Sequence, residues 1–111
     1  MKKENNFVEN LKILDGTITY NDFDIDEILS FEDQKYNYKE DILQIKYGEG
    51  LTLDVGWYPA YNPKGFFVTR AIENYDWETP LSKIKCRSLA NLKKAIEKTA
   101  ILIVEARKNK Q

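Results

Sequence analysis

The chain has no histidine, and this removes most of the common catalytic arrangements. The usual general base, the Ser-His-Asp and Cys-His nucleophiles and most zinc sites all need an imidazole ring. The single cysteine, Cys86, is therefore expected to be a small core side chain. A glycine-rich phosphate loop is missing too, because Gly48 and Gly50 bracket a short turn and do not open a helix.

Carboxylates are the next groups that could do chemistry. Asp22, Asp24 and Asp26 have the spacing with which a calcium loop begins. The pattern then fails, because Glu27 stands where the loop needs glycine and Asp33 replaces its closing glutamate. A carboxylate pair of the glycosidase kind would have to come from four residues whose spacing selects no pair: Asp41, Asp54, Glu73 and Glu78. We therefore expect no enzymatic activity, no metal and no cofactor.

Charge is distributed very unevenly along the chain, although the net charge is only −1. Residues 15–54 contain eleven acidic and three basic side chains, a net charge of −8. Residues 55–111 contain eleven basic and five acidic side chains, a net charge of +6. An acidic segment of this length repels nucleic acid and attracts a basic protein surface. The expected partner is therefore a basic protein.

The elements that position these residues are predicted from hydrophobic periodicity. Four segments are predicted as strands: 42–47, 51–58, 66–73 and 81–87. In the first, second and fourth of them, side chains of two kinds alternate along the chain. The first two are joined by a short glycine-bearing loop, which indicates an antiparallel hairpin. From Ser88, a favourable N-cap, apolar residues recur at helical spacing. The sequence predicts a single α+β domain over residues 1–111, an antiparallel meander of about four strands with a C-terminal helix on one face.

Four segments leave the secondary structure open. Residues 7–14 fit a strand or a short helix equally well. Residues 17–20 have the β-branched and aromatic composition of a strand, and 22–26, if extended, would place two apolar side chains opposite three carboxylates. Residues 100–104 are apolar on every side, so either they form a helix whose outer side is covered or they form a closing strand. We favour the helix.

Tyrosines gather in segments without periodicity. Tyr and Trp anchor protein interfaces because they offer a large contact area at a small entropic cost. Trp57 is in phase with the inward face of its strand and is assigned to the core, whereas the tyrosines outside the core pattern are expected to be exposed. Together with the acidic segment they form the predicted partner-binding surface: Asp22, Asp24, Asp26, Glu32, Asp33, Tyr36, Tyr38, Glu40, Asp41, Tyr58 and Tyr61.

Two other surfaces offer alternative interactions. Lys83, Lys85 and Arg87 would form a basic stripe on one strand, for which an ordinary solvated strand face is a simpler interpretation than a phosphate site. A homo-oligomer or an adaptor would instead use the apolar end of the C-terminal helix, through Ile101, Leu102 and Val104.

The sequence also indicates a compartment. Met1–Asn6 is positively charged, but no apolar stretch or small-residue cleavage site follows it, so no signal peptide is expected. Apolar runs are all far shorter than the roughly 18 residues of a membrane span. A lone cysteine cannot form an internal disulfide, so the fold does not require an oxidising compartment. We expect a cytoplasmic protein that does not bind a membrane.

The segment DWETPLSKIKCRSLANLKKAIEKT, together with the acidic stretch and the lack of catalytic residues, resembles the small immunity proteins of bacterial polymorphic toxin and contact-dependent growth inhibition systems. The likeness covers the general layout from Asp22 to Thr99. Immunity proteins have several unrelated folds, so the resemblance transfers no functional residue. It implies an inhibitor that binds a cognate toxin, such as a basic nuclease domain, in the cytoplasm of the producing cell.

Overall fold

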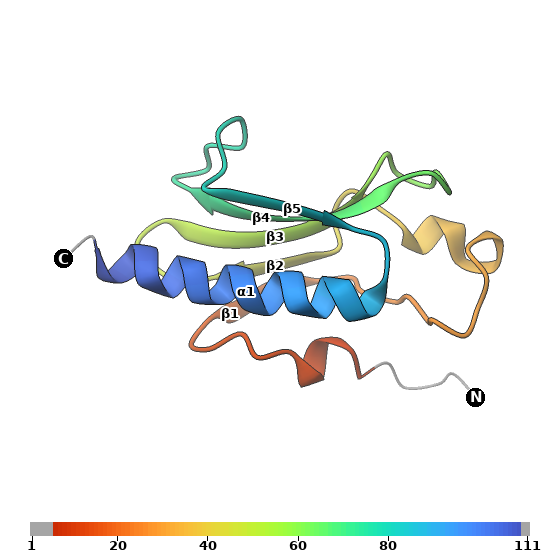
Figure 1. Ribbon diagram of the computed structural model, residues 1–111, viewed down its shortest axis with the longest axis horizontal. Helices are drawn as coiled ribbons and strands as arrows, with labels where there is room; N and C mark the ends of the chain where they lie inside the picture. The colour runs from red at the N-terminus through yellow and green to blue at the C-terminus, as the bar shows by residue number, and fades with distance from the viewer. Residues whose placement is uncertain (1–5, 110–111) are drawn as a thin grey trace.

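The computed structural model describes residues 6–109, in which a five-stranded antiparallel sheet carries one long helix on one face (Figure 1). The elements in chain order are η1 (Val8–Asn10), β1 (Thr17–Asn21), η2 (Glu32–Asn37), β2 (Leu43–Lys46), β3 (Leu51–Tyr58), β4 (Phe66–Glu73), β5 (Ser82–Cys86) and α1 (Leu89–Lys108). Residues 1–5, to which the expectation of no signal peptide refers, lie outside the described residues.

The predicted α+β meander is confirmed, with one strand more than the four expected. The strand order in the sheet is β1-β2-β3-β4-β5, and every neighbouring pair is antiparallel. The hairpin of β2 and β3 pairs Leu43 with Val55 and Ile45 with Leu53. The additional strand is β1, where the β-branched composition indicated one. Residues 7–14, left open between strand and helix, contain the short 3-10 helix η1.

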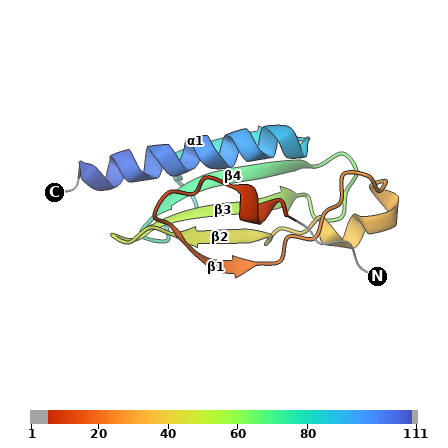
Figure 2. The same cartoon turned by 90° about the horizontal axis from the view of Figure 1, so that it is seen from below.

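The hydrophobic core lies between the sheet and α1. Figure 2 shows the helix along one side of the sheet and β1 at the edge farthest from it. Alternate residues of β3 point into this layer and are buried, because successive side chains of a strand face opposite sides. The helix contributes buried residues at a spacing of three and four: Leu92, Ile96, Ala100 and Ile103. Its predicted N-cap is confirmed, since the Ser88 hydroxyl accepts the Asn91 amide at 3.1 Å.

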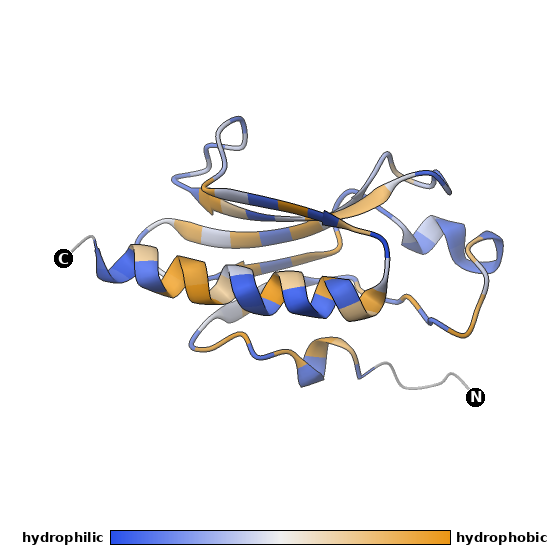
Figure 3. Cartoon of the chain, in the orientation of Figure 1, coloured by the Kyte–Doolittle hydropathy of each residue, from blue (hydrophilic) through white to orange (hydrophobic). Residues whose placement is uncertain are grey.

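Residues 11–15 run along α1 and cover part of its apolar end, where Figure 3 shows apolar residues in both segments. Two hydrogen bonds join these residues to α1: Lys12 N–H donates to Glu97 Oε2 at 2.9 Å, and Arg107 Nη2 donates to Asp15 Oδ2 at 2.7 Å. Residues 100–104 are helical, as favoured. Leu102 and Val104 are half-buried against the core, and Ile101 remains 56% exposed.

Among the described residues, two buried hydroxyls have no hydrogen-bond partner, those of Thr69 on β4 and Thr99 on α1. A buried unpaired hydroxyl costs about 1–3 kcal/mol, and valine has the same shape without the polar atom. We expect Thr69→Val and Thr99→Val each to raise the free energy of unfolding by about 1 kcal/mol in urea denaturation. Thr52 is the matched control, because its buried hydroxyl accepts Lys46 Nζ at 3.0 Å. An equal gain from Thr52→Val would contradict this explanation.

Candidate functional site

The predicted partner-binding residues gather mainly at the end of the molecule where α1 begins (Figure 1). Three segments meet there: residues 22–30, η2 and the loop 59–65 between β3 and β4. Backbone and ring contacts join them, since Tyr61 N–H donates to the Tyr38 carbonyl at 2.8 Å and the rings of Tyr36 and Tyr61 lie 5.4 Å apart. We call this region the acidic end.

The acidic run after β1 leaves the sheet and does not continue as a strand. The Asp22 amide still donates to the Ile42 carbonyl of the β2 side at 2.8 Å, but β1 has ended at Asn21. The alternation of apolar and acidic residues has a different cause. Ile25 is buried in the core, and Phe23 is half-buried with its ring stacked on Phe7 at 4.5 Å. Residues 22–26, whose secondary structure the sequence left open, therefore form a loop.

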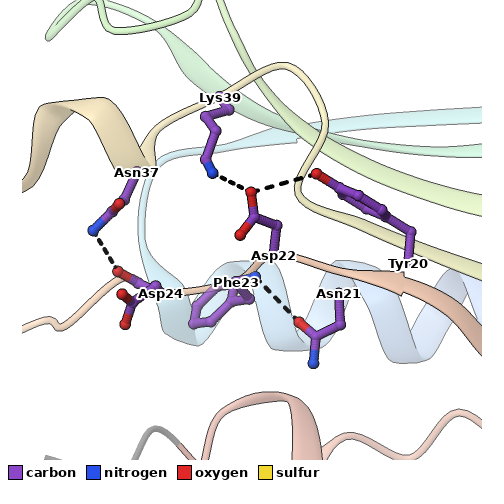
Figure 4. Close-up of polar contacts among 7 residues, drawn as sticks. All are labelled: Tyr20, Asn21, Asp22, Phe23, Asp24, Asn37 and Lys39. Carbon is purple, nitrogen blue, oxygen red and sulfur yellow. Dashed lines mark hydrogen bonds and ion pairs between the residues drawn. The ribbon is translucent and has the colours of Figure 1, made fainter. Parts of the chain in front are cut away.

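Side chains of η2 and of the residues that follow it bind this loop (Figure 4). They take the place of the backbone partners that a strand would have. Asn37 Nδ2 donates to the Asp24 carbonyl at 2.8 Å. Lys39 forms an ion pair with Asp22, whose carboxylate also lies 3.4 Å from the Tyr20 hydroxyl. The hydrogen bond from Lys39 lowers the pKa of Asp22. The Asp22 carboxylate is therefore already engaged within the chain and is a weak anchor for a partner.

Gln34, a buried residue of η2, fixes the turn that follows the loop. Its Oε1 accepts the Asp26 amide at 2.9 Å, and its Nε2 donates to the carbonyls of Asp26 and Leu29 at 2.7 and 3.2 Å. The Asp26 carboxylate accepts the Ile28 amide at 2.9 Å and completes the turn. Both sides of the turn are thus tied to one side-chain amide.

A pocket of about 610 Å³ opens between this turn, the residues around η1 and the start of α1. Three carboxylates line it, those of Asp24, Asp26 and Glu27, together with the basic Lys93. The remaining lining is mostly apolar: Phe7, Ile25, Ile28, Leu29, Leu89 and Ala90. Ile28 is 73% and Leu29 49% exposed, so the pocket has an adjacent pair of accessible aliphatic side chains in its lining. The pocket suits a cationic group that carries an apolar neighbour.

The tyrosines of the predicted site lie in different environments. Tyr36 is 68% and Tyr61 48% exposed, as expected. The expectation that Tyr38 is exposed is wrong, because this side chain is half-buried against the core. Its ring packs in a cluster with Phe31, Trp57 and Phe67, at centroid distances of 4.6, 4.6 and 5.9 Å. The core position of Trp57 is confirmed.

Tyr58 lies on the face of the sheet away from α1, where its polar and aromatic groups both have partners within the chain. Its hydroxyl donates to the Glu40 carbonyl at 3.1 Å, and the guanidinium of Arg70 lies 4.8 Å above its ring. Glu40 and Asp41 are exposed and lie in a bulge opposite β3. The bulge follows Lys39, whose carbonyl accepts the Trp57 N–H. Tyr58 is thus half-buried, and the expectation of an exposed ring is met only in part.

Comparison of the chain with protein-family models, curated proteins and solved structures finds no match. The interpretation of the acidic end therefore rests on its geometry. Within residues 6–109, no three or more Cys, Asp or Glu side chains are grouped so that they could hold a metal ion. Over the same residues, no helix has the length and apolar character needed to cross a bilayer.

Asp54 is a buried carboxylate on the face of the sheet away from α1. It is 2% exposed, accepts Gln44 Nε2 at 3.1 Å and stands opposite Arg70 in the register of β3 and β4. Burial raises the pKa of Asp54, and this effect outweighs the hydrogen bond from Gln44 and the attraction of Arg70. The charged form of Asp54 is therefore less favourable in the folded than in the unfolded chain.

We expect Asp54→Asn to raise the free energy of unfolding at pH 7. When the pKa of a carboxyl is higher in the folded than in the unfolded state, the free energy of unfolding falls as the pH rises from the lower pKa through the higher one. The amide keeps the hydrogen bond to Gln44 and cannot ionise, so its advantage should shrink as the pH falls toward the ordinary aspartate pKa of 3.8. Urea denaturation at several pH values measures this. A variant less stable than the native chain at pH 7 would mean that attraction to Arg70 dominates.

The basic residues on the same face pack within the chain. Cations lie over three aromatic rings: Lys46 over Tyr75 at 4.6 Å, Arg70 over Tyr58 at 4.8 Å and Arg87 over Phe66 at 5.4 Å. Long cationic side chains can cover apolar surface with their stems. Val68 and Ile72 are buried on this face, although no helix covers it. Lys83 and Lys85 are exposed on β5, which fits the solvated strand face expected there.

Sequence reasoning missed several residues of the acidic end. The apolar rim of the pocket, Ile28 and Leu29, was not included in the predicted site. The sequence contains a signal for it, since two adjacent aliphatic residues follow four acidic positions without joining a periodic element. The supporting roles of Gln34 and Asn37 have no such signal, because an amide that bonds a distant backbone leaves no local pattern.

Proposed function

We propose that the chain is a cytoplasmic inhibitor of the immunity-protein type, which binds a basic bacterial toxin domain through its acidic end. The observation that carries the proposal is the pocket of about 610 Å³, whose wall combines three carboxylates with an apolar rim. A nuclease binds phosphate groups in a cationic cleft, and carboxylates offer that cleft the same sign of charge. The rim residues Ile28 and Leu29 supply apolar contact area, which gives such a complex its affinity.

The charges of the acidic end favour rapid association with a basic surface. Three carboxylates of the acidic end are exposed, Glu27, Glu32 and Asp33, and the exposed Glu40 and Asp41 follow η2 in the chain. Two of the lysines nearby are engaged in ion pairs, Lys39 with Asp22 and Lys35 with Glu32 at 3.8 Å. The end therefore presents a net negative field, which raises the rate of encounter with a cationic partner. The exposed rings of Tyr36 and Tyr61 extend the contact surface.

The proposal predicts that a toxin domain is encoded beside the gene of this chain, and that domain is the probe for the test. Stopped-flow mixing should show a specific complex whose association rate falls by about tenfold or more between roughly 0.02 and 0.5 M NaCl. The dissociation rate should change much less, because apolar contacts at the pocket rim are not screened by salt. Absence of a complex would refute the proposal. An association rate indifferent to salt would refute the electrostatic part of it.

A second candidate is a protein-binding or homo-oligomeric domain that uses α1. It is favoured by the exposure of Ile101, whereas Leu102 and Val104 already pack against the core of the chain. Sedimentation equilibrium at about 100 μM distinguishes the two candidates. A dimer that the substitution Ile101→Lys dissociates would support the homo-oligomer. A monomer would leave the inhibitor as the better explanation.

A further inference from the structure

The two edges of the sheet differ in how they are protected against another strand. Edge strands expose unpaired peptide groups, and proteins commonly block them with lysine. The β5 edge has this protection, because Lys83 and Lys85 are both exposed on a strand of five residues. The β1 edge does not, because Thr17–Asn21 contains no charged residue and no proline.

β1 is also the most accessible strand of the structure. All five of its residues are exposed, and among the described helices and strands it contacts β2 alone. A bulge between Ile18 and Tyr20 turns these two side chains to opposite faces of the sheet, since Ile18 pairs with the inward Ile45 and Tyr20 with the outward Gln44. Ile18 is 39% and Tyr20 42% exposed. An added strand would therefore find an apolar or aromatic contact on each face.

We infer that β1 is the docking edge for an extended segment of the toxin domain, which adds to the sheet as a sixth strand. This inference rests on the proposed function and names how the partner is held. Backbone hydrogen bonds to an edge strand give affinity with little demand on sequence, and side chains at alternate positions give specificity. The β-branched residues of β1 favour such pairing.

The charge that follows β1 selects the kind of segment. β1 leads directly from Asn21 into residues 22–30, which we call the acidic loop, and these reach the pocket lined by Asp26 and Glu27. A strand paired with β1 that extends beyond Asn21 therefore enters a negative field. The complementary segment is extended and uncharged along β1 and carries lysine or arginine at the end that reaches the acidic loop. A neutral or acidic extension would not be attracted there.

The test combines amide hydrogen exchange with charged substitutions on the β1 edge, using the toxin domain of the stopped-flow experiment as the probe. In the complex, the outward amides of residues 17–21 should exchange about tenfold more slowly or better. Ile18→Lys and Ile18→Glu should both weaken binding by about tenfold or more, because either charge would be desolvated beside an added strand. The matched controls are Ile101→Lys and Ile101→Glu, at an exposed apolar position of α1, which should bind normally.

The outcomes separate this inference from the proposed function. If the toxin domain binds but β1 gains no protection and both Ile18 variants bind normally, the docking edge is refuted and the inhibitor remains. If only Ile18→Lys weakens binding, electrostatic repulsion explains the result and strand addition is refuted. If the native chain forms no complex, the proposed function fails and the docking edge fails with it. A circular dichroism spectrum equal to that of the native chain confirms that each variant is folded.

Discussion

Replacing Gly56 by alanine is expected to lower the free energy of unfolding by about 3 kcal/mol or more, one of the largest effects available to a single methyl group in this fold. Gly56 lies in the middle of β3, opposite the bulge formed by Glu40 and Asp41. A Cβ atom there would overlap the Glu40 carbonyl oxygen, with the carbonyl carbon at 2.7 Å and Tyr58 Cε2 at 2.9 Å. Backbone cannot move aside as a flexible side chain can, so the bulge would have to separate from β3.

Gly48→Ala is the matched control for this prediction. Gly48 has a φ of +76°, and a Cβ atom there would meet nothing within 4 Å. Its substitution should therefore cost only the strain of the left-handed conformation, about 1 kcal/mol. Urea denaturation of both variants measures the difference in the free energy of unfolding. Equal losses at the two positions would show that the close approach of Glu40 to β3 is not a constraint.

Reversing two charges of the acidic end is expected to weaken toxin binding by about a hundredfold or more, because lysines would then face a basic cleft. Glu27 and Asp33 are the appropriate pair, since both are exposed and neither anchors the turn at Asp26. The stability of the fold should change by no more than about 0.5 kcal/mol, as is usual for exposed positions. Calorimetric titration with the toxin domain, paired with thermal denaturation of the free variant, measures the two effects.

The control for charge reversal changes the net charge equally at the other end of the molecule. Glu78 in the loop between β4 and β5 and Glu105 near the end of α1 are both exposed. Glu78→Lys with Glu105→Lys should bind nearly as tightly as the native chain, with a modestly reduced association rate. If this control loses as much affinity as Glu27→Lys with Asp33→Lys, the effect is one of total charge. The binding surface would then lie elsewhere.

The sheet and the helix could be predicted because their signals are local. The alternation over β2, β3 and β5 and the helical spacing after Ser88 each repeat several times within one segment. The apolar residues 100–104 left a choice between helix and strand, because an apolar run without polar positions has no period; they continue α1. The position of Trp57 followed from its phase in β3. Packing of an amphipathic helix on an amphipathic sheet then fixes the architecture.

The acidic end could be predicted in composition but not in arrangement. Tyr38 has no periodic neighbours, so its burial beside Trp57 depends on the path of the chain after η2. The acidic run after Asn21 alternates like a strand, yet its backbone is held by Asn37 and Gln34, residues distant in sequence. Contacts between a side-chain amide and a remote backbone group have no period that a sequence pattern can display.

The support that Gln34 and Asn37 give to the acidic loop bears on how this surface can change over generations. Their amides bond the carbonyls of Asp24, Asp26 and Leu29 and the Asp26 N–H, all atoms that every amino acid other than proline possesses. Side chains at most positions from 24 to 29 can therefore be exchanged while the scaffold beneath them stays the same. The side-chain chemistry of a surface built in this way can change by single substitutions while its backbone keeps the same fold.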